Sequence, residues 1–443
     1  MQNSIAIVGC GISGISASIE LIKRNIKHTI FEARNTIGGR FYSFYDPTFD
    51  FELDNGQHFF SSAYSNFFYV LDFLGSLEKL DYSKDSRIYF YSEGKQKFCL
   101  EKKIFGGKFG LLGGLLNLKS LPFTSRIKLL RLFLDFMFSS EIHISEPLSA
   151  YELLEMKKQD NETIKKFWEP VCISIFNNSI DKIPAELFKH TIKLAFLSNT
   201  NTLGFLYSKV PQSQLLNEYL NLSKKNGIEL NLSSKINHLQ LKGDDFILTT
   251  KEGREFKFKY VILCVPPNNL KKILPNAWIQ TQEFKFLENV SFNPILSIYL
   301  TTKEPIISEP YGYLLGSPIH WIFNRNIMLN IPKPQNFYSI TISNSHQFTN
   351  KSSEEIKKEL VAEIQRHFQI KPEILCWKPI KEKFATVSID LEFHKLRPKQ
   401  ETSIPGLFLA GDWTNTKLPA TLESAALSGK LAVEKLLNNM GYL

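Results

Sequence analysis

An apolar strand that ends in a glycine-rich turn constrains the fold of this chain more than any other feature. Residues 5–14 read Ile-Ala-Ile-Val-Gly-Cys-Gly-Ile-Ser-Gly, a buried strand that runs into a GxGxxG turn. Gly9 permits the tight turn, Gly11 lets the backbone approach a pyrophosphate, and Gly14 lets the next helix pack on its strand. A second apolar strand ends in Glu32, at the spacing expected of a carboxylate that binds ribose hydroxyls. Strand, turn, helix, strand and acid in this order predict a dinucleotide-binding Rossmann-like domain.

The stretch that follows the second strand narrows the dinucleotide to FAD. Residues 32–40 read Glu-Ala-Arg-Asn-Thr-Ile-Gly-Gly-Arg. This ExxxxxGGR pattern resembles the second phosphate-contacting loop of the flavoproteins that include amine oxidases, protoporphyrinogen oxidases and carotenoid desaturases. The resemblance implies that Gly38 and Gly39 let the backbone come close to the cofactor. It also implies that Arg40 lies by the diphosphate, a role suited to a fork of donors.

The far end of the chain resembles the same flavoproteins. Residues 406–413 read as a buried strand that ends in Gly411 and Asp412, and residues 418–429 start a helix with small residues on one face. In the family, this pairing places the Asp on the ribityl-phosphate part of FAD. The helix N-terminus points at the flavin ring, where its partial positive charge stabilises the reduced ring. Residues 260–267 resemble the family's strand that returns to the nucleotide domain, so FAD contacts are expected from the beginning, middle and end of the chain.

Motifs between these ends extend the resemblance to essentially the whole chain. Together they are similar to the squalene-associated, desaturase-like flavoproteins, the hydroxysqualene dehydroxylase family. The motifs are Asp-Asn-Gly-Gln-His at 54–58, Phe-Trp-Glu-Pro at 167–170, Trp-Ile-Phe-Asn-Arg at 321–325, Lys-Glu-Lys-Phe-Ala-Thr at 381–386, Arg-Pro at 397–398 and Leu-Pro-Ala-Thr-Leu-Glu at 418–423. The chain departs from the family at Phe176, where Leu is usual, and at Ser424, where Gly is usual.

Carried onto this sequence, the resemblance implies a set of FAD contacts. They are Gly9, Gly11, Ser13, Gly14, Glu32, Ala33, Arg34, Gly38, Gly39, Arg40, Asn55, Gly56, Ile236, Gly411, Asp412, Leu418 and Thr421. Ile236 belongs to a stretch that occupies the place where the family holds the adenine end. No cysteine follows Cys376, so non-covalent FAD is expected.

The implied reaction is the reductive removal of the allylic hydroxyl of hydroxysqualene to give squalene. Loss of the hydroxyl needs a nearby acid, and an aromatic and aliphatic pocket would suit both the hydrocarbon and the positive charge that develops. His58 and Glu169 are the candidate acids. Trp321 and Arg325 would either line the pocket or pack the sheet, and packing is the expected role.

Other functions remain open from the sequence. A carotenoid desaturase would use the same cradle to take hydride instead of donating it, and a non-catalytic FAD-binding lipid carrier is an alternative from another class. An amine oxidase is disfavoured because Leu418 and Pro419 stand near the place of the family's aromatic residue. The chain shows one dinucleotide fingerprint, so an external electron donor is expected.

The scattered FAD segments predict an α/β chain in which an α+β substrate domain is inserted into a Rossmann-like FAD-binding domain. We assign residues 1–65, 205–285 and 376–443 to the FAD-binding domain and residues 66–204 and 286–375 to the substrate domain. Between the first FAD segments and about residue 200, the spacing of apolar residues predicts helices. Strands are expected within 228–265 and 290–345. The expected helices are 66–74, 126–138, 150–158, 162–176 and 184–196.

The distribution of charge suggests a partner for one segment. Residues 102–134 hold seven Lys or Arg and no acid, among many Leu, Ile and Phe. This composition predicts contact of residues 102–138 with an anionic membrane surface, although a helix pair with a solvated basic face has the same pattern. Although the net charge is +9, the sequence contains no nucleic-acid-binding motif, so no nucleic acid partner is expected.

The cysteines bear on metal binding and location. The five cysteines form no CxxC pair, which predicts neither disulfides nor a metal site. A reducing cytoplasm is therefore expected. Together with the membrane contact of residues 102–138, this predicts a cytoplasmic protein that is peripheral on the inner face of the cell membrane.

Overall fold

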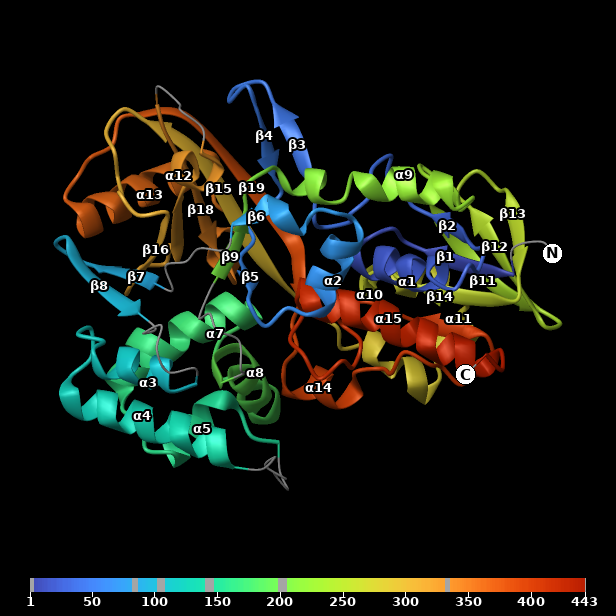
Figure 1. The fold of residues 1–443 in the computed structure, drawn as a ribbon, viewed down its shortest axis with the longest axis horizontal. Helices are drawn as coiled ribbons and strands as arrows, with labels where there is room; N and C mark the ends of the chain where they lie inside the picture. Colours follow the sequence, from blue (N-terminus) through green and yellow to red (C-terminus); the bar gives the residue numbers. More distant parts are fainter. Residues whose placement is uncertain are drawn as a thin grey trace.

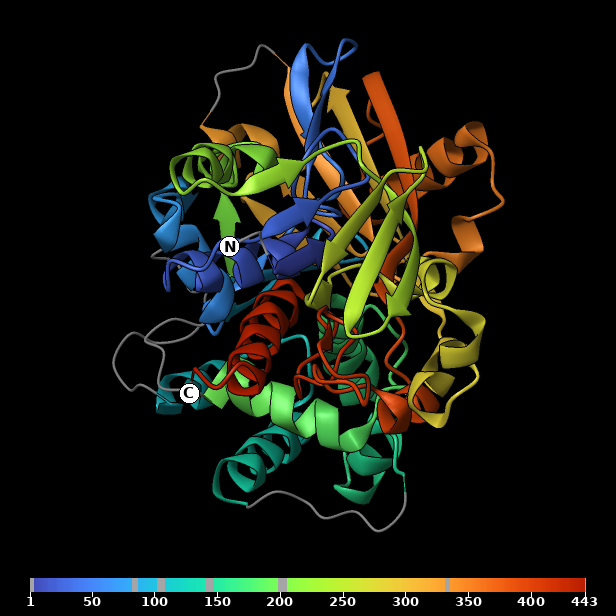
Figure 2. The same ribbon diagram turned by 90° about the vertical axis from the view of Figure 1, so that its right-hand side faces the viewer.

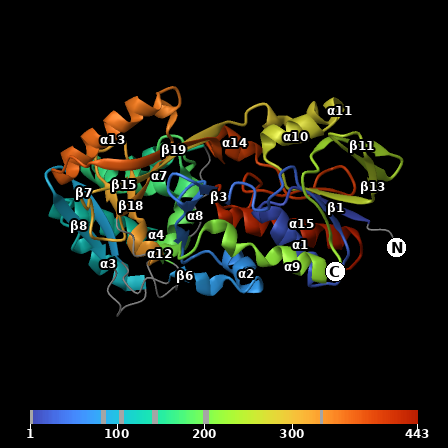
Figure 3. The same cartoon turned by 90° about the horizontal axis from the view of Figure 1, so that it is seen from above.

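The computed structural model describes residues 4–81, 87–101, 108–139, 147–197, 205–330 and 335–442. These residues form two parts side by side, one around a five-stranded sheet and the other around a seven-stranded sheet with helices packed beneath it (Figure 1). Seen from above, the two sheets occupy opposite ends of the long axis, and both chain ends lie at the five-stranded end (Figure 3).

The five-stranded sheet is parallel and has the order β10-β2-β1-β14-β20. Its strands are β1 (Ile5–Val8), β2 (Thr29–Phe31), β10 (Glu229–Asn231), β14 (Tyr260–Leu263) and β20 (Leu407–Leu409). Every residue of β1 is buried, as is typical of a parallel strand covered on both faces. The sheet draws on the beginning, middle and end of the chain, so the predicted α/β fold with a discontinuous Rossmann-like domain is confirmed.

Alternate residues of β1 face two different layers. Ile5 and Ile7 pack with the helices α1 (Ile12–Ile22) and α15 (Leu422–Asn439), which lie side by side (Figure 2). Ala6 and Val8 belong to the core on the other face. That face is covered by an antiparallel sheet of β11 (Ile236–Lys242), β12 (Asp245–Thr250) and β13 (Glu255–Phe258).

The seven-stranded sheet has the order β19-β15-β18-β17-β16-β7-β8. Its pairs are antiparallel except β16 with β7. The strands are β7 (Arg87–Ser92), β8 (Gln96–Glu101), β15 (Phe292–Thr302), β16 (Tyr311–Leu314), β17 (Trp321–Asn324), β18 (Asn336–Ile342) and β19 (Ile374–Val387). The amphipathic helix α13 (Ser353–Phe368) packs its apolar side on one face.

Helices cover the other side of this sheet. They are α3 (Lys108–Leu116), α4 (Phe123–Phe138), α5 (Ala150–Met156), α6 (Asn161–Thr163), α7 (Glu169–Phe176) and α8 (Ala185–Leu197). A π-helical turn at Ile164–Trp168 joins α6 to α7. It places Trp168 in the core, where its ring stacks on Phe133 with centroids 5.6 Å apart. All the helices predicted for this region are present.

The remaining strands and α-helices belong to neither of the two large sheets nor to the helices that cover them. They are β3 (Ser43–Asp46), β4 (Phe51–Asp54), β5 (Phe60–Ser61), β6 (Leu80–Asp81), β9 (Phe205–Ser208), α2 (Asn66–Phe73), α9 (Glu218–Lys225), α10 (Pro267–Ile273), α11 (Asn276–Ile279), α12 (Arg325–Leu329) and α14 (Leu391–Leu396).

One feature of the first 200 residues differs from the sequence prediction. The region predicted as helical also contains β7 and β8, because β7 pairs with β16, more than two hundred residues away. Strand β19, which contains residue 376, pairs with β15 along most of its length.

Part of the basic segment 102–138 is engaged inside the molecule. Residues 102–107 lie outside the described residues, and most of the leucines that follow are buried in the core. Arg126 donates to the carbonyls of Leu116 and Leu121, and Lys128 pairs with Asp160 at 3.3 Å. Much of the segment's apolar and basic character therefore serves packing and helix ends.

Candidate active site

A cavity of about 520 Å³ lies between the two parts of the molecule. One portion of its wall comes from the edge of the five-stranded sheet at which β1, β2 and β14 end. The other portion comes from β17, β18, α7 and α8. The sequence-predicted cofactor residues that line it are Gly9, Gly11, Ser13, Glu32, Ala33, Arg34, Gly38, Gly39, Arg40, Gly56, Ile236, Gly411, Asp412, Leu418 and Thr421.

The glycine turn after β1 has the geometry that its sequence predicts. Gly9 has φ +103°, and a Cβ there would lie 2.7 Å from the Cys264 carbonyl oxygen. A Cβ on Gly14 would lie 2.0 Å from the Gly9 oxygen, so Gly14 serves helix packing behind the cavity wall. Gly11 is the N-cap residue of α1 and offers no side-chain cap. The first N–H groups of α1 are thus free to bind an anion at the cavity.

Glu32 follows β2 and is held by backbone amides. Its Oε2 accepts from the N–H of Cys10 at 2.8 Å, and its Oε1 accepts from the N–H of Arg34 at 2.9 Å. Each oxygen keeps a lone pair, so the carboxylate still has room for hydroxyl donors. The N–H of Ser234 donates to the Glu32 carbonyl, which brings the start of β11 and Ile236 to this end of the cavity.

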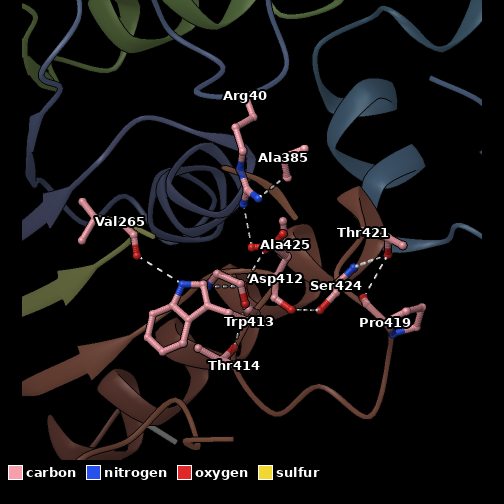
Figure 4. A network of polar contacts seen from close by, with 12 residues as sticks. Arg40, Val265, Ala385, Asp412, Trp413, Thr414, Pro419, Thr421, Ser424 and Ala425 are labelled. Atoms are coloured by element: carbon pink, nitrogen blue, oxygen red, sulfur yellow. Dashed lines mark hydrogen bonds and ion pairs between the residues drawn. The ribbon is translucent and has the colours of Figure 1, made fainter. Parts of the chain in front are cut away.

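Arg40 and Asp412 form an ion pair across the cavity wall (Figure 4). Arg40 Nη2 donates to Asp412 Oδ1 at 2.7 Å, and Nη1 donates to the carbonyl of Ala385 at 2.7 Å. The pair compensates the Asp412 charge and leaves other guanidinium donors for an anionic group. The Thr421 hydroxyl caps α15 by accepting from the N–H of Ser424.

Arg397, to which the sequence assigned no role, fixes the loop behind this pair. It is buried and donates to the carbonyls of Asp412, Trp413, Thr414 and Leu418. Burial lowers its pKa to about 10, and Asp412 opposes that shift. The Arg-Pro dipeptide gave no sign of this role, because its partners are backbone carbonyls.

Together these features fit FAD in three respects. An uncapped helix N-terminus suits a phosphate, a carboxylate with open lone pairs suits a ribose, and the Arg40–Asp412 pair suits the rest of a diphosphate-linked chain. The structure thus gathers Gly11, Arg40 and Asp412, from distant parts of the sequence, at one cavity.

A cluster of aromatic rings forms the wall farther from the glycine turn. Phe59 is at its centre, with ring centroids 5.0 Å from Phe205, 5.3 Å from Trp321 and 4.9 Å from Phe323. All four residues line the cavity, so Trp321 does more than pack the sheet. Its Nε1–H donates to the Ser174 hydroxyl at 2.9 Å, which fixes the indole plane.

The two candidate acids occupy very different places. His58 lines the cavity, but burial and, secondarily, the Arg40 cation lower its pKa to about 4. The ring is therefore neutral near pH 7 and poorly suited to donate a full proton. Glu169 is exposed at the first residue of α7 and is not part of the wall, because that helix turns Ser174 and Ile175 to the cavity instead. The geometry does not support the expectation for Glu169.

Asn55 also lies outside the wall. Its side-chain amide reaches the Arg40 carbonyl at 3.4 Å, and its backbone N–H donates to the Tyr42 carbonyl at 2.9 Å. Asn55 therefore supports the loop that carries Arg40.

Glu423 is a site residue that the sequence did not single out. Its carboxylate accepts from the backbone N–H groups of Ser65, Asn66 and Phe67. It thereby caps α2 and holds the neighbouring cavity wall.

The chain is similar to known proteins over nearly all of its length. The model of the family described as flavin containing amine oxidoreductase matches residues 12–437. Hydroxysqualene dehydroxylase of Sinorhizobium fredii is 25% identical and covers 99% of both chains. The dehydroxylase of Zymomonas mobilis is 23% identical over 98% of this chain and 99% of its own. The 15-cis-phytoene desaturase of Solanum lycopersicum is 24% identical over 99% of this chain but 78% of its own.

Solved structures show the same fold. Putrescine oxidase superposes with a TM-score of 0.76 at 15% identity and covers 99% of both chains. Reduced UDP-galactopyranose mutase gives a TM-score of 0.71 at 14% identity and covers 100% of this chain and 95% of its own. A flavin carried in a dinucleotide-binding cradle is FAD, so FAD is the cofactor of this oxidoreductase. On the match over residues 12–437, the chain belongs to the flavin-containing amine oxidoreductases.

Proposed function

We propose that this FAD-dependent oxidoreductase removes the hydroxyl of hydroxysqualene reductively and yields squalene. The dehydroxylases of Sinorhizobium fredii and Zymomonas mobilis support this substrate because they match the chain from end to end, whereas the phytoene desaturases extend beyond it. Gly9, Gly11, Glu32, Arg40 and Asp412 would hold the cofactor.

The observation that carries the proposal is that each acidic side chain in the cavity wall already has a structural partner. Among the described residues that line the cavity, the carboxylates are Glu32, Asp412 and Glu423. Glu32 and Glu423 accept from backbone amides, and Asp412 pairs with Arg40. All three carboxylates thus hold the cofactor cradle or cap a helix, and an uncharged hydrocarbon alcohol needs no further counter-charge in the chamber.

The residues of the chamber suit the loss of a hydroxyl. In the net reaction the C–O bond breaks with its electron pair on oxygen, a proton from solvent completes a water molecule, and a hydride replaces the hydroxyl on carbon. Bound FAD in its reduced form supplies that hydride. The rings of Phe59, Trp321 and Phe323 exclude water and present electron-rich faces to the positive charge on the allylic carbons. His58 stays neutral and can offer a hydrogen bond only.

The reaction needs a source of electrons and the substrate is a lipid, so we propose two further partners. The single dinucleotide fingerprint supports an external electron donor. We also propose peripheral binding to an anionic membrane through α4, where Phe123 and Phe138 are 65% and 77% exposed and Arg131 is exposed between them. Helix α8 packs against α4 and α5, and its Leu194 lines the cavity, so α8 lies between α4 and the chamber. No helix within the described ranges has the length and apolar character needed to cross a bilayer.

Anaerobic turnover tests the proposal. The purified holoenzyme is reduced, then offered hydroxysqualene and phytoene separately. Reoxidation of the flavin with formation of squalene is the expected result. Turnover of phytoene alone by the oxidised enzyme would make the chain a desaturase. Binding of both lipids without any change of flavin redox state would make it a lipid carrier.

A further inference from the structure

A buried ion pair lies directly behind the chamber wall. Asp54, the last residue of β4, and Arg325, the first residue of α12, are each 1% exposed, and Arg325 Nη2 donates to Asp54 Oδ2 at 3.1 Å. Asp54 Oδ1 also accepts from the Ser43 hydroxyl at 2.8 Å and from the Gln212 N–H at 2.9 Å. Neither charged side chain lines the cavity. Burial of such a pair is costly and is not explained by stability alone, because apolar residues of similar volume often stabilise a core as well.

The pair controls the side chain of Gln57, which does line the cavity. Arg325 Nη1 donates to Gln57 Oε1. Because a guanidinium group has donors and no acceptor, this contact settles which end of the amide faces it: the oxygen faces Arg325, and the nitrogen faces away. Gln57 Nε2 donates one N–H to the His58 carbonyl at 3.2 Å. Its second N–H is left as an oriented neutral donor in the wall.

This donor comes from the same short segment as the centre of the aromatic cluster, and both line the cavity. Gln57 is two residues before Phe59, the ring at the centre of the cluster. The Gly56 carbonyl accepts from Gln212 Nε2 at 2.6 Å, so the backbone before Gln57 is fixed through the same network that binds Asp54. A polar group that reached Gln57 would leave its carbon skeleton against the rings.

We propose that the Gln57 amide holds the hydroxyl oxygen of the substrate alcohol, and that Asp54 and Arg325 are positioning residues that aim this amide. This inference rests on the proposed function and deepens it. The hydrogen bond favours departure of the oxygen with the bonding electron pair and transfers no proton, which still comes from solvent. A neutral donor suits the apolar chamber better than a carboxylic acid, which would be ionised or would need its own partner.

Two substitutions of Gln57 separate donation from packing. Gln57→Leu removes the amide, and Gln57→Glu keeps an oxygen for Arg325 but has no N–H to offer beside that cation. Gln214→Leu is the matched control, since the Gln214 side chain donates to Glu52 outside the cavity. For Arg325, the conservative Arg325→Lys keeps a charge for Asp54 but loses the fork that reaches both partners.

The readouts are FAD content, affinity for squalene, affinity for hydroxysqualene in the oxidised enzyme, and the anaerobic rate of flavin reoxidation. We expect both Gln57 variants to keep FAD and squalene affinity within about twofold, and to lose roughly ten- to a hundredfold in alcohol affinity and rate. Arg325→Lys should show the same selective loss in smaller degree.

Equal losses for alcohol and hydrocarbon, or an unchanged reoxidation rate in Gln57→Leu, would overturn the assignment. If the wild-type enzyme is not reoxidised by hydroxysqualene at all, the proposed function fails instead, so the two failures are distinct.

Discussion

Replacement of Gly11 by Ala separates cofactor binding from folding. A Cβ on Gly11 would meet only the Cα of Gly39 at 3.9 Å and the oxygen of Gly38 at 4.0 Å, which are ordinary contacts. The residue has φ −77° and ψ −173°, which alanine also adopts. The poorer N-cap and the lower entropy of the unfolded chain nearly cancel, so the apoprotein should change in stability by less than about 1 kcal/mol. The added methyl group would, however, occupy space that a pyrophosphate approaches.

Overpacking at that point should weaken FAD binding by roughly ten- to a hundredfold, from a penalty of about 1–3 kcal/mol. Titration of the apoprotein by quenching of FAD fluorescence measures the affinity, and thermal unfolding of the apoprotein measures stability. Gly14→Ala is the contrasting variant, because its Cβ would lie 2.0 Å from the Gly9 oxygen and should destabilise the apoprotein itself. FAD affinity equal to wild type in Gly11→Ala would refute the close approach of cofactor and backbone.

Four further perturbations follow from the contacts described above. Arg40→Ala removes one side of the ion pair and should lower FAD affinity by at least about tenfold in the same titration. Phe59→Leu should keep FAD and slow the anaerobic reoxidation by hydroxysqualene by roughly tenfold, since it removes the ring at the centre of the cluster. Burial lowers the pKa of His28 to about 4 from 6.5, so its stabilising contribution is present above pH 6.5 and is lost as pH falls towards 4. Between pH 7 and 4.5 wild type should lose about 2 kcal/mol more unfolding free energy than His28→Gln in urea titrations. The double change Phe123→Ser and Phe138→Ser should reduce co-sedimentation with anionic vesicles and leave FAD content unchanged.

The parts of the cradle that the sequence could predict depend on local backbone geometry. Gly9 and Gly14 are needed for a positive φ and a close helix approach, which are properties of a few consecutive residues. Strand β1, which precedes them, was also predictable from consecutive residues, since each of its four residues is apolar. Glu32 follows β2, and its position was predictable because parallel strands end at the same edge of a sheet. The end of β2 therefore lies beside the glycine turn that follows β1.

The parts that could not be predicted depend on partners far away in the sequence. Strand β7 has a sequence compatible with several structures and is fixed by pairing with β16. The exposure of Glu169 depends on which side of α7 meets the seven-stranded sheet, and its neighbouring Trp-Glu-Pro motif does not reveal that side. The motif therefore predicted a helix beside the cavity, but it did not reveal that Ser174 and Ile175 are the residues that line it.

Arg325 shows most clearly how the fold changes the meaning of a residue. In the sequence it follows an apolar strand and is expected to pack the sheet, and it is indeed buried. Its partners Asp54 and Gln57 come from a segment about 270 residues earlier, so only the folded chain shows that one cation binds both a carboxylate and a cavity-wall amide. A free charge inside an apolar chamber would cost several kcal/mol of desolvation and would favour charged ligands. Placing the charges behind the wall and one neutral amide in it orients a polar group while the chamber stays suited to a hydrocarbon.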